Sequence, residues 1–460
     1  MILISPGRLL ASRFPLFAAA LLAAILSGCC QLARWETPAD ITEWQSPDPP
    51  TKSLAEKAAL YQARLEAHHQ TPEGLLRYRR VIADTDDPSY GDLGDGCFHT
   101  GIYLASQALR LAATGNPAAK EQVIRTLGAL EILMDVSGKR GLLARHFTPH
   151  DTLRAGWPQS RTLPAYDWKP DVSKDQYAGF VHGLGVAFAL VDDPALRGKV
   201  AALAAAAADH LMENDLRIMD ADGRPTTYGN LSGRFAGVFP MGINALIALS
   251  ISKLAAVSAG QEPYTGFYSR LIETGYASVA HWAYMAPLGI NNGVNENMGY
   301  LALYPLLLLE KDPRILERLK SGGRRTWGHV KDERNAFFAF VHAGAVERGA
   351  GGDPGSAAEA ARAGRDALRE FPESKIELPV DLTRPGFDFP RAFLNSRKCL
   401  PRTTSAIPLY LRPRSSSMWA SDPYRLVGSL TRRGERENAG MDYLLAYWMG
   451  RYYGFISPEE

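Results

Sequence analysis

From about residue 54 onward, apolar residues recur along this chain with helical spacing, and almost no stretch alternates in the manner of a β-strand. The pattern therefore predicts an all-α protein. Twelve helices are expected, at about 54–69, 98–114, 118–136, 174–191, 194–213, 238–258, 264–284, 296–310, 313–330, 335–343, 355–371 and 442–453.

The predicted helices are of two kinds that alternate along the chain. Segments such as "FHTGIYLASQALRLAA" and "MGYLALYPLLLL" are apolar or small nearly all round, as helices buried on every side must be. Segments such as "PRILERLKSGGRRTWGHV" carry charge on one face. The joints "TGNPAA", "VDDPAL" and "EKDPRI" place Asn or Asp before a proline, which caps and starts a helix. Six inner and six outer helices predict an (α/α)6 toroid, closed by pairing 54–69 with 442–453.

The connections indicate where a ligand would bind. Those from an inner to an outer helix are short, whereas those from outer to inner helices are long, at about 137–173, 214–237 and 372–441. Long loops in a compact domain are usually functional. All of them lead to the N-termini of inner helices, so we expect them to gather on one face, called the mouth below.

Polar clusters stand at three of these inner helix starts: "GDGCFHTG", "SKDQYAG" and "NNGVNENMG". With the alternating helices, they make the chain resemble the six-hairpin glycosidase superfamily over roughly residues 54 to 456. That group includes glycoside hydrolases, unsaturated uronyl hydrolases and, with related toroids, polysaccharide lyases. The resemblance implies a carbohydrate-active enzyme with an oligosaccharide ligand, and it carries over the fold better than an activity. Terpene cyclases also use α/α toroids, but the chain has no aspartate-rich diphosphate motif.

Asp175 is the first candidate catalytic residue. Ser173 and Gln176 match a capping box, and an acid in the first turn suits the helix dipole, so a purely structural interpretation exists. However, Asp175 and His182 are seven residues apart and share one face of a buried helix. A carboxylate and an imidazole facing a cavity are what proton transfer needs.

The third cluster supplies a second carboxylate, Glu296, expected to complete an acid/base pair with Asp175. One helix cap does not require four asparagines, whereas amide groups match the hydroxyls of a sugar. In the first cluster, Asp95 and His99 are four residues apart and can face the mouth together. The remaining predicted substrate-binding residues are Gln176, His182, Asn291, Asn292, Asn295, Asn297 and Tyr300.

The long loops add cations and aromatic rings. Arg145 and His146 follow the third helix, together with the aromatic residues Trp157, Tyr166 and Trp168, which would stack on sugar rings. Seven basic residues against one acid in 384–414 favour an acidic ligand if that loop covers the mouth. "DADGRPTTYGN" lacks the full spacing of a calcium loop and is expected to be a turn. No metal and no cofactor is predicted.

Three functions remain open. In a hydrolase, Asp175 or Glu296 would protonate the leaving oxygen while the other activates water. In a lyase, His99 or His182 with Tyr300 would abstract the proton next to a carboxylate that Arg145 neutralises. In a non-catalytic protein of the cell envelope, the toroid would bind a glycan or a protein partner. The paired carboxylates favour hydrolysis.

The N-terminus predicts export. A basic start, an apolar stretch and "LSGC" resemble a bacterial lipoprotein signal (1–28), in which Cys29 is lipidated, although a simple signal peptide or an anchor helix is the alternative. Residues 29–53 read as a tether and 54–456 as the toroid, in an envelope protein anchored to the membrane by lipid. No other run reaches the roughly 18 apolar residues of a spanning helix.

Charge and cysteine content narrow the choice further. Removing Arg8 and Arg13 with the signal brings the net charge from +2 to zero, which argues against nucleic acid as a partner. No C-x-x-C spacing is present, so a structural zinc site is not expected. Cys97, expected in the core, and Cys399 are candidates for a disulfide that the sequence alone does not establish.

Overall fold

The computed structural model describes residues 34–35, 50–81, 90–91, 94–150, 156–235, 239–240, 242–283, 293–377, 402–412, 414–424 and 436–460. The helices there are α2 (Leu54–Arg64, continued by a π-helical turn Leu65–His69), α3 (Gly96–Thr114), α4 (Pro117–Asp135), α5 (Lys174–Leu190), α6 (Pro194–Glu213), α7 (Gly242–Ala259), α8 (Glu262–Glu273), α9 (Tyr276–Ala280), α10 (Gly293–Leu309), α11 (Pro313–Val330), α12 (Ala336–Val341, continued by a π-helical turn His342–Val346), α13 (Pro354–Glu370) and α15 (Met441–Tyr452).

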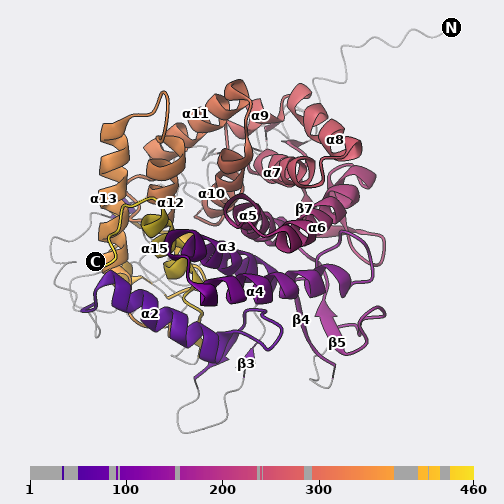
Figure 1. Ribbon diagram of the computed structural model, residues 1–460, viewed down its shortest axis with the longest axis horizontal. Coiled ribbons are helices and arrows are strands. Elements are labelled where there is room, and N and C mark those ends of the chain that lie inside the picture. Colours follow the sequence, from indigo (N-terminus) through magenta and orange to yellow (C-terminus); the bar gives the residue numbers. More distant parts are fainter. Residues whose placement is uncertain are drawn as a thin grey trace.

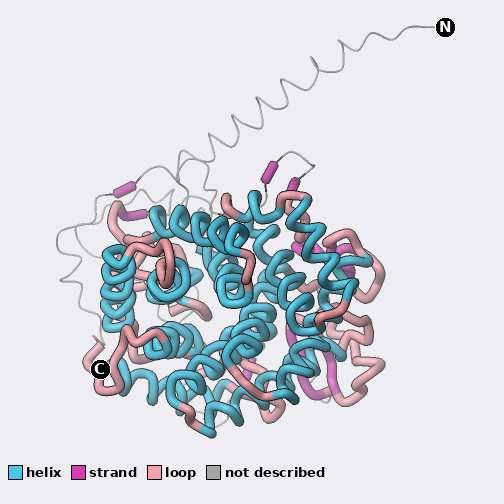
Figure 2. Tube along the Cα trace, turned by 45° about the horizontal axis from the view of Figure 1, so that its top comes forward, coloured by secondary structure: helices cyan, strands magenta, loops and turns pink. Residues whose placement is uncertain are grey.

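These helices form six hairpins arranged in a ring (Figures 1 and 2). The inner helices are α3, α5, α7, α10, α12 and α15, and their outer partners are α4, α6, α8, α11, α13 and α2. The prediction of an all-α (α/α)6 toroid is confirmed. The one predicted helix that differs is 264–284, which divides into α8 and α9 because Gly275 lies between them at φ 87°.

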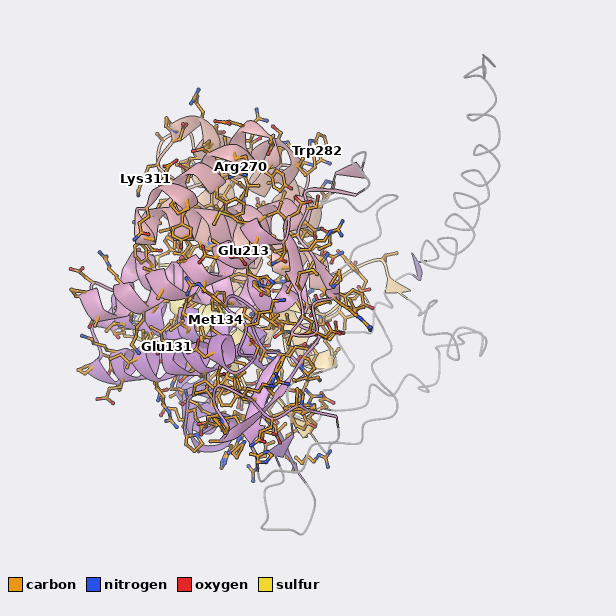
Figure 3. All side chains as sticks on the ribbon, turned by 90° about the vertical axis from the view of Figure 1, so that its right-hand side faces the viewer. Glu131, Met134, Glu213, Arg270, Trp282 and Lys311 are labelled. Atoms are coloured by element: carbon orange, nitrogen blue, oxygen red, sulfur yellow. The ribbon has the colours of Figure 1, made fainter. Side chains whose placement is uncertain are left out.

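Short strands, which the hydrophobic pattern did not predict, occupy the long connections. Three antiparallel hairpins, a three-stranded sheet in the order β11-β2-β3, and a parallel pair β1-β10 are formed. Seen from the side in Figure 3, strands gather at one end of the helical layer. Their bounds are β1 (Arg34–Trp35), β2 (Tyr78–Arg80), β3 (Tyr90–Gly91), β4 (His146–Pro149), β5 (Tyr166–Lys169), β6 (Arg217–Met219), β7 (Pro225–Asn230), β8 (Arg234–Phe235), β9 (Phe239–Pro240), β10 (Arg402–Thr403) and β11 (Arg436–Glu437).

The predicted joints between hairpins are present. Asn116, Asp193 and Asp312 each accept a hydrogen bond from a backbone amide of the helix that the next proline begins, at 2.8–3.0 Å. Asp353 caps α13 before Pro354 in the same way. Each cap satisfies an amide that would otherwise lack a partner and fixes where the outer helix starts.

The ring closes where its first and last helices meet. The Tyr443 hydroxyl of α15 donates to the Leu54 carbonyl at 2.8 Å, and the Leu54 amide donates to the Glu460 carbonyl at 2.9 Å. The buried ammonium of Lys57 donates to the Leu368, Arg369 and Phe371 carbonyls, which satisfies the C-terminal end of α13. Because of its burial, the pKa of Lys57 is lowered to about 8.

The innermost helices approach one another closely. At the contact of α3 with α5, a Cβ atom on Gly101 would lie 2.0 Å from the Gly179 carbonyl oxygen, so the two backbones touch. On its other side α5 packs on α10, where the His182 Nδ1 atom hydrogen-bonds to the Leu301 carbonyl at 2.9 Å. We call the α3–α5 contact the glycine seam.

Helix α7 is, among the described residues, the helix that is long and apolar enough to cross a membrane. The sequence had not indicated it as a spanning segment. Its 18 residues have a mean hydropathy of 1.5, but 72% of them are buried within the toroid. That burial is what a core helix of the inner layer requires.

Candidate functional site

The mouth is the end of the ring at which the inner helices begin. Helices α3, α5 and α10 run parallel, because residue numbers rise together along each contact. Gly179 and Gly183 of α5 meet Phe98 and Gly101 of α3, and His182 and Gly185 of α5 meet Leu301 and Pro305 of α10. Their positive dipole ends therefore point the same way, which favours acidic groups and anions there. Polar side chains at the inner helix starts are Asp95, Asp175, Gln176, Asn244, Glu296, Asn297, Asn335 and Asp442.

Arg145 organises a hydrogen-bonded group at the starts of α3 and α5. Its Nη2 atom donates to Asp95 Oδ1 at 2.6 Å, and its Nε atom donates to the Gly94 carbonyl at 2.7 Å. Its Nη1 atom donates to both Ser173 Oγ and the Asp171 carbonyl at 3.2 Å. All three nitrogens of the guanidinium thus have protein partners, and Arg145 positions its neighbours instead of offering a free fork to a ligand.

Gln176 joins two carboxylates within the same group. Its Nε2 atom donates to Asp95 Oδ1 at 2.9 Å and to Asp175 Oδ2 at 3.4 Å. Its Oε1 atom accepts from the Phe98 amide at 3.0 Å. The capping-box prediction for Ser173 and Gln176 is therefore wrong: Ser173 makes no side-chain cap, because its hydroxyl donates to Asp175 Oδ1 and the glutamine amide reaches across to α3. Asp95, Arg145, Ser173, Asp175 and Gln176 are called the acid cluster below.

The acid cluster gives Asp175 the properties of a proton donor. Its burial raises the pKa of the carboxyl, and the Asp95 charge raises it further. The Ser173 hydrogen bond and the Arg145 charge oppose that rise without cancelling it. Asp95 keeps 40% of its side chain exposed, so the cluster is open to solvent at the mouth.

His99 lies one turn below Asp95 on α3 and is buried, with only 2% of its surface exposed. Neither ring nitrogen has a hydrogen-bond partner within the described residues. Burial lowers its pKa to about 4, opposed by the charges of Asp95 and Asp442. His99 is therefore neutral at physiological pH and can accept or donate one hydrogen bond to a ligand or water.

The other two histidines predicted for the site, His182 and His146, have different surroundings. His182 does not contact Asp175: it lies deeper in α5, fully buried against Tyr304 and Phe337, with ring centroids 5.9 and 5.7 Å away. Its pKa is lowered to about 4 by burial. His146 begins β4 and packs on the start of α3, where a Cβ atom on Gly96 would come within 2.5 Å of its ring.

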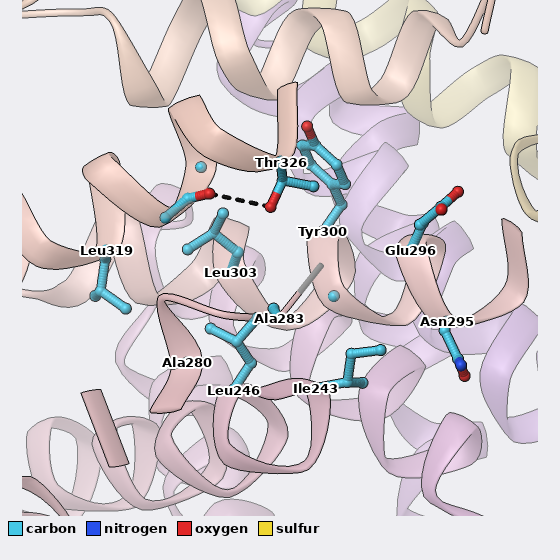
Figure 4. Close-up of a pocket in the computed structure, with 13 residues that line it drawn as sticks. Ile243, Leu246, Ala280, Ala283, Asn295, Glu296, Tyr300, Leu303, Leu319 and Thr326 are labelled. Carbon is cyan, nitrogen blue, oxygen red and sulfur yellow. Dashed lines mark hydrogen bonds between the residues drawn. The ribbon is translucent and has the colours of Figure 1, made fainter. Parts of the chain in front are cut away.

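Four of the predicted residues of the third cluster lie on α10. Asn295, Glu296 and Tyr300 line a pocket bounded by α7, α9, α10 and α11 rather than the acid cluster (Figure 4). Asn297 is buried, and its Nδ2 atom has no hydrogen-bond partner in the described part of the chain. Asn291 and Asn292 lie outside the described residues. The carboxylate that the structure places beside Asp175 is thus Asp95, on a different helix from Glu296.

A second group of polar residues lies beneath residues 402–424. Asp442, at the start of α15, forms an ion pair with Lys375 at 2.7 Å, and both side chains are 1% exposed. Asp442 Oδ2 also accepts from the Met418 amide at 2.8 Å. Asn335 donates to the Trp419 carbonyl at 3.0 Å. These bonds fasten the connection over the starts of α12 and α15.

In the basic run 384–414, Arg412 has a structural role. Arg412 is buried and donates to the Ile407 and Glu333 carbonyls, each at 2.7 Å, and burial lowers its pKa to about 10. It holds the covering connection in place rather than facing a ligand. Arg384, Arg391, Arg397 and Lys398 lie outside the described residues.

Cys97 and the turn with Asp220 and Asp222 have structural surroundings in the described part of the chain. Cys97 is a buried free thiol whose pKa is raised by burial, while Cys399 lies outside the described residues. Asp220 and Asp222 accept backbone amides of a turn, as expected. Within the described residues, no group of three or more His, Cys, Asp or Glu side chains could hold a metal ion.

Sequence reasoning missed three residues of the mouth. Lys174 donates to Asn244 Oδ1 at 3.0 Å, next to Asp175, and burial lowers its pKa. Ser173 was interpreted only as a cap, and Asp442 was not considered. A usable signal existed for Asp442, since "MDYLLAYWMG" places an acid in the first turn of an apolar helix, as "SKDQYAG" does.

Comparison with known proteins finds similarity to solved structures and none at the level of sequence. No family model matches the chain, and no curated protein is similar to it in sequence. Among solved structures, a cellobiose 2-epimerase from Spirochaeta thermophila is similar with a TM-score of 0.42 and 12% identity, over 87% of this chain and 97% of that one. A GH9 protein of Bacteroides ovatus (0.40, 11%, 88% and 83%) is also similar. So is an unsaturated glucuronyl hydrolase of Streptococcus agalactiae (0.38, 11%, 94% and 95%). The (α/α)6 fold of this chain follows from its own ring of inner and outer helices.

Proposed function

We propose that this protein is a carbohydrate-active enzyme that hydrolyses a glycosidic bond at the acid cluster, with Asp175 as general acid. The observation that carries the proposal is the pairing of Asp175, whose pKa is raised, with Asp95 through one amide nitrogen of Gln176. Hydrolysis of glycosides needs two carboxyl groups with different affinities for protons. Asp95 replaces Glu296 as the second carboxylate in this proposal.

The spacing of the pair favours one stereochemical course. Because Asp95 Oδ1 and Asp175 Oδ2 accept from the same nitrogen at 2.9 and 3.4 Å, these two oxygens lie at most 6.3 Å apart, the sum of the two distances. That limit is below the roughly 6.5–9.5 Å separation of inverting enzymes and admits the roughly 5–5.5 Å of retaining ones. We therefore propose that Asp95 acts as the nucleophile while Asp175 protonates the leaving oxygen. The anomeric form of the first product, followed by NMR, tests this assignment.

A lyase is less favoured by the same geometry. Its mechanism would need a cation to neutralise the carboxylate next to the abstracted proton, and Arg145 was the candidate. All three of its nitrogens already donate to protein oxygens. The predicted bases were His99 or His182 with Tyr300. His182 lies deeper in α5 than the acid cluster, and Tyr300 lines the pocket bounded by α7, α9, α10 and α11, so the histidine beside the acid cluster, His99, does not share a site with Tyr300.

The test of the proposed function is the variant Asp175→Asn. The change keeps the size and most hydrogen bonds of the side chain but removes the transferable proton, so turnover should fall by about 10²- to 10⁴-fold. The alkaline limb of the pH–rate profile should disappear as well. A panel of neutral and acidic oligosaccharides provides the substrate, and Asp193→Asn, in a distant helix cap, is the matched control.

Full activity in Asp175→Asn would remove Asp175 from the mechanism. In that case Glu296→Gln is the next variant to measure. If neither variant changes the turnover of a substrate that the wild type cleaves, the acid cluster is not the active site. If the wild type binds oligosaccharides without cleaving them, the toroid is a binding protein.

We also propose that the protein is attached to the bacterial cell envelope through a lipid on Cys29. The support is the sequence "LSGC" after an apolar stretch, which lies outside the described residues. Cys29→Ser should give unprocessed or soluble protein. Radiolabelled fatty acid incorporated into the Cys29→Ser variant would contradict the proposal.

A further inference from the structure

A polar groove lies on the outside of the ring, between the outer helices α11 and α13. It encloses about 440 Å³, which falls in the range of roughly 300–1,000 Å³ typical of small-molecule sites. The inner helix α12 and its π-helical turn pack between the two outer helices and form the floor (Figure 1). The acid cluster lies elsewhere, at the starts of α3 and α5, so the proposed hydrolysis gives this groove no role. We call it the α11–α13 groove.

The π-helical turn places a network of buried polar groups in the floor. The Glu347 amide donates to the His342 carbonyl, five residues back, at 2.9 Å, and the His342 Nε2 atom lies 3.6 Å from Glu347 Oε1. Arg324 Nε donates to both oxygens of Glu347, at 3.0 and 3.1 Å. The charges of Arg324 and Glu347 are therefore paired with each other. A π-helical turn within an α-helix is frequently found at functional sites.

Ser356 keeps a hydroxyl proton for the groove. Its Oγ atom lies 2.9 Å from His342 Nε2. Burial lowers the pKa of His342 to about 4, so its ring is neutral at physiological pH and carries one proton. The Glu347 carboxylate beside Nε2 favours that proton on Nε2, and Ser356 then accepts it. The hydroxyl of Ser356 can therefore donate to a ligand.

Three further groups that line the groove have no partner within the described residues: the indole N–H of Trp327, the ammonium of Lys331 and the carboxylate of Glu359. The Trp327 ring is held by stacking on His342, with centroids 4.9 Å apart and planes inclined by 15°. The groove thus presents hydrogen-bond donors together with an acceptor. Its described lining contains no aliphatic side chain, so it suits a polar ligand.

The opposite charges of the free groups restrict the ligand further. A ligand with a net charge would meet a like charge, from either Lys331 or Glu359. Hydroxyl groups can accept from the indole and the ammonium and donate to the carboxylate at the same time. We propose that the α11–α13 groove binds a neutral sugar, at a site separate from the acid cluster. The site does not depend on glycan cleavage.

The test is an NMR titration of the full chain, labelled with ¹⁵N at tryptophan, with methyl glucoside, methyl galactoside and methyl mannoside. The Trp327 indole signal, identified by its loss in Trp327→Phe, should shift saturably with at least one of these sugars. The uronate and the amino sugar of the same configuration should each bind at least threefold more weakly. Ser356→Ala should weaken binding about twofold to tenfold, as expected for one lost hydrogen bond.

The matched variants are Gly328→Gln and Gly198→Gln. Each replaces an exposed helical glycine, and nothing lies within 4 Å of a Cβ atom added at either position. Gly328 lines the groove, whereas Gly198 lies on α6. Gly328→Gln should occupy the groove and weaken sugar binding at least tenfold without lowering the melting temperature. Gly198→Gln should leave sugar binding unchanged and should not lower the melting temperature either.

Three results would overturn the proposal: no saturable shift of the Trp327 signal with any of the sugars, equal affinity in the wild type and Gly328→Gln, or a charged analogue that binds as tightly as the neutral sugar. Asp175→Asn separates this proposal from the hydrolase proposal, because it should give the same Trp327 response as the wild type. A protein that cleaves no glycan but shows the Trp327 response would contradict only the hydrolase proposal. The reverse result would contradict only the groove proposal.

Discussion

Two carboxylates at neighbouring inner helices, Asp95 and Asp442, illustrate how differently the two halves of the mouth are built. Asp95 precedes α3, pairs with Arg145 and keeps 40% of its side chain exposed. Asp442 begins α15, pairs with Lys375 and is 1% exposed. Both benefit from a helix N-terminus. Among the described residues, the difference is the connection 402–412 and 414–424, which covers the half around α12 and α15 and leaves the half around α3 and α5 open.

The comparison teaches that solvent access, rather than residue type, separates a candidate catalytic acid from a structural ion pair. A covered carboxylate whose oxygens bond Lys375 and the Met418 amide has no face for a substrate. The acid cluster, in contrast, combines partial burial with an opening. Partial burial raises the pKa of Asp175, and the opening admits the group to be protonated.

The largest effect on stability is expected from Asp442→Asn. The change leaves the charge of Lys375 buried without a counter-ion, which should lower the free energy of unfolding by about 3–5 kcal/mol. The same replacement in the open half, Asp95→Asn, should cost less than about 1 kcal/mol, because the Asp95–Arg145 pair is partly exposed. Urea denaturation measures both. Similar losses in the two variants would show that the halves do not differ in burial.

Gly179→Ala tests the glycine seam beneath the open half. An added Cβ atom would lie 2.5 Å from the Phe98 carbonyl oxygen and 2.7 Å from its Cα, so α3 and α5 must separate. Overpacking of this kind should cost roughly 1–3 kcal/mol. Gly128→Ala in α4 is the control, since nothing lies within 4 Å of its added Cβ. Equal melting temperatures of the two variants would refute the contact.

Acid should destabilise the toroid through its buried histidines. The pKa values of His99 and His182 are lowered to about 4, below the usual value of 6.5, so protonation favours the unfolded chain. Their contribution is complete above about pH 6.5 and is lost as pH falls toward 4, at up to about 2 kcal/mol per histidine between pH 7 and 5. Unfolding at both pH values should show a smaller loss in His182→Asn than in the wild type. An unchanged pH dependence would contradict the assignment.

The smallest effect is expected from Asp175→Asn on stability alone. Because the pKa of Asp175 is raised in the folded state, its contribution is present at low pH and is lost as pH rises through the folded value. Asparagine stays neutral at every pH, so the variant should change the free energy of unfolding by less than about 1 kcal/mol. Its stability relative to the wild type should be greater at neutral pH than at acidic pH. Melting curves at acidic and neutral pH provide the measurement. A large loss at neutral pH would make Asp175 a structural residue.

The fold could be predicted from the sequence because the burial of each helix determines the pattern of apolar and charged residues along it. Alternation of all-apolar with one-sided helices marks the inner and outer layers, and the Asx-Pro joints mark where outer helices begin. The split at Gly275 and the short strands in loops were not predicted, because tertiary contacts decide them. Such features depend on neighbours that are distant along the chain.

The candidate site could be predicted only in part, because it too depends on contacts between residues that are distant along the chain. Asp175 and Asp95 were selected from their positions at helix starts, but their pairing depends on the direction of the Gln176 side chain, which the sequence pattern assigned to a cap. Glu296 carries the same local signal as Asp175 and lines another pocket. Helix-start chemistry identifies candidates, and only the packing of inner helices against each other decides which candidates meet.

The closure of the ring has a consequence for how the chain folds. The bond from Tyr443 to the Leu54 carbonyl joins residues 389 positions apart, so the first helix finds its partner only after nearly the whole chain is available. Contacts of such high sequence separation slow folding and expose apolar surface in the meantime. The hairpins between α3 and α13 can assemble as they emerge, while α2 remains without its inner neighbour. A chain that ends before α15 should therefore retain helical hairpins yet aggregate, because its ring has two open edges.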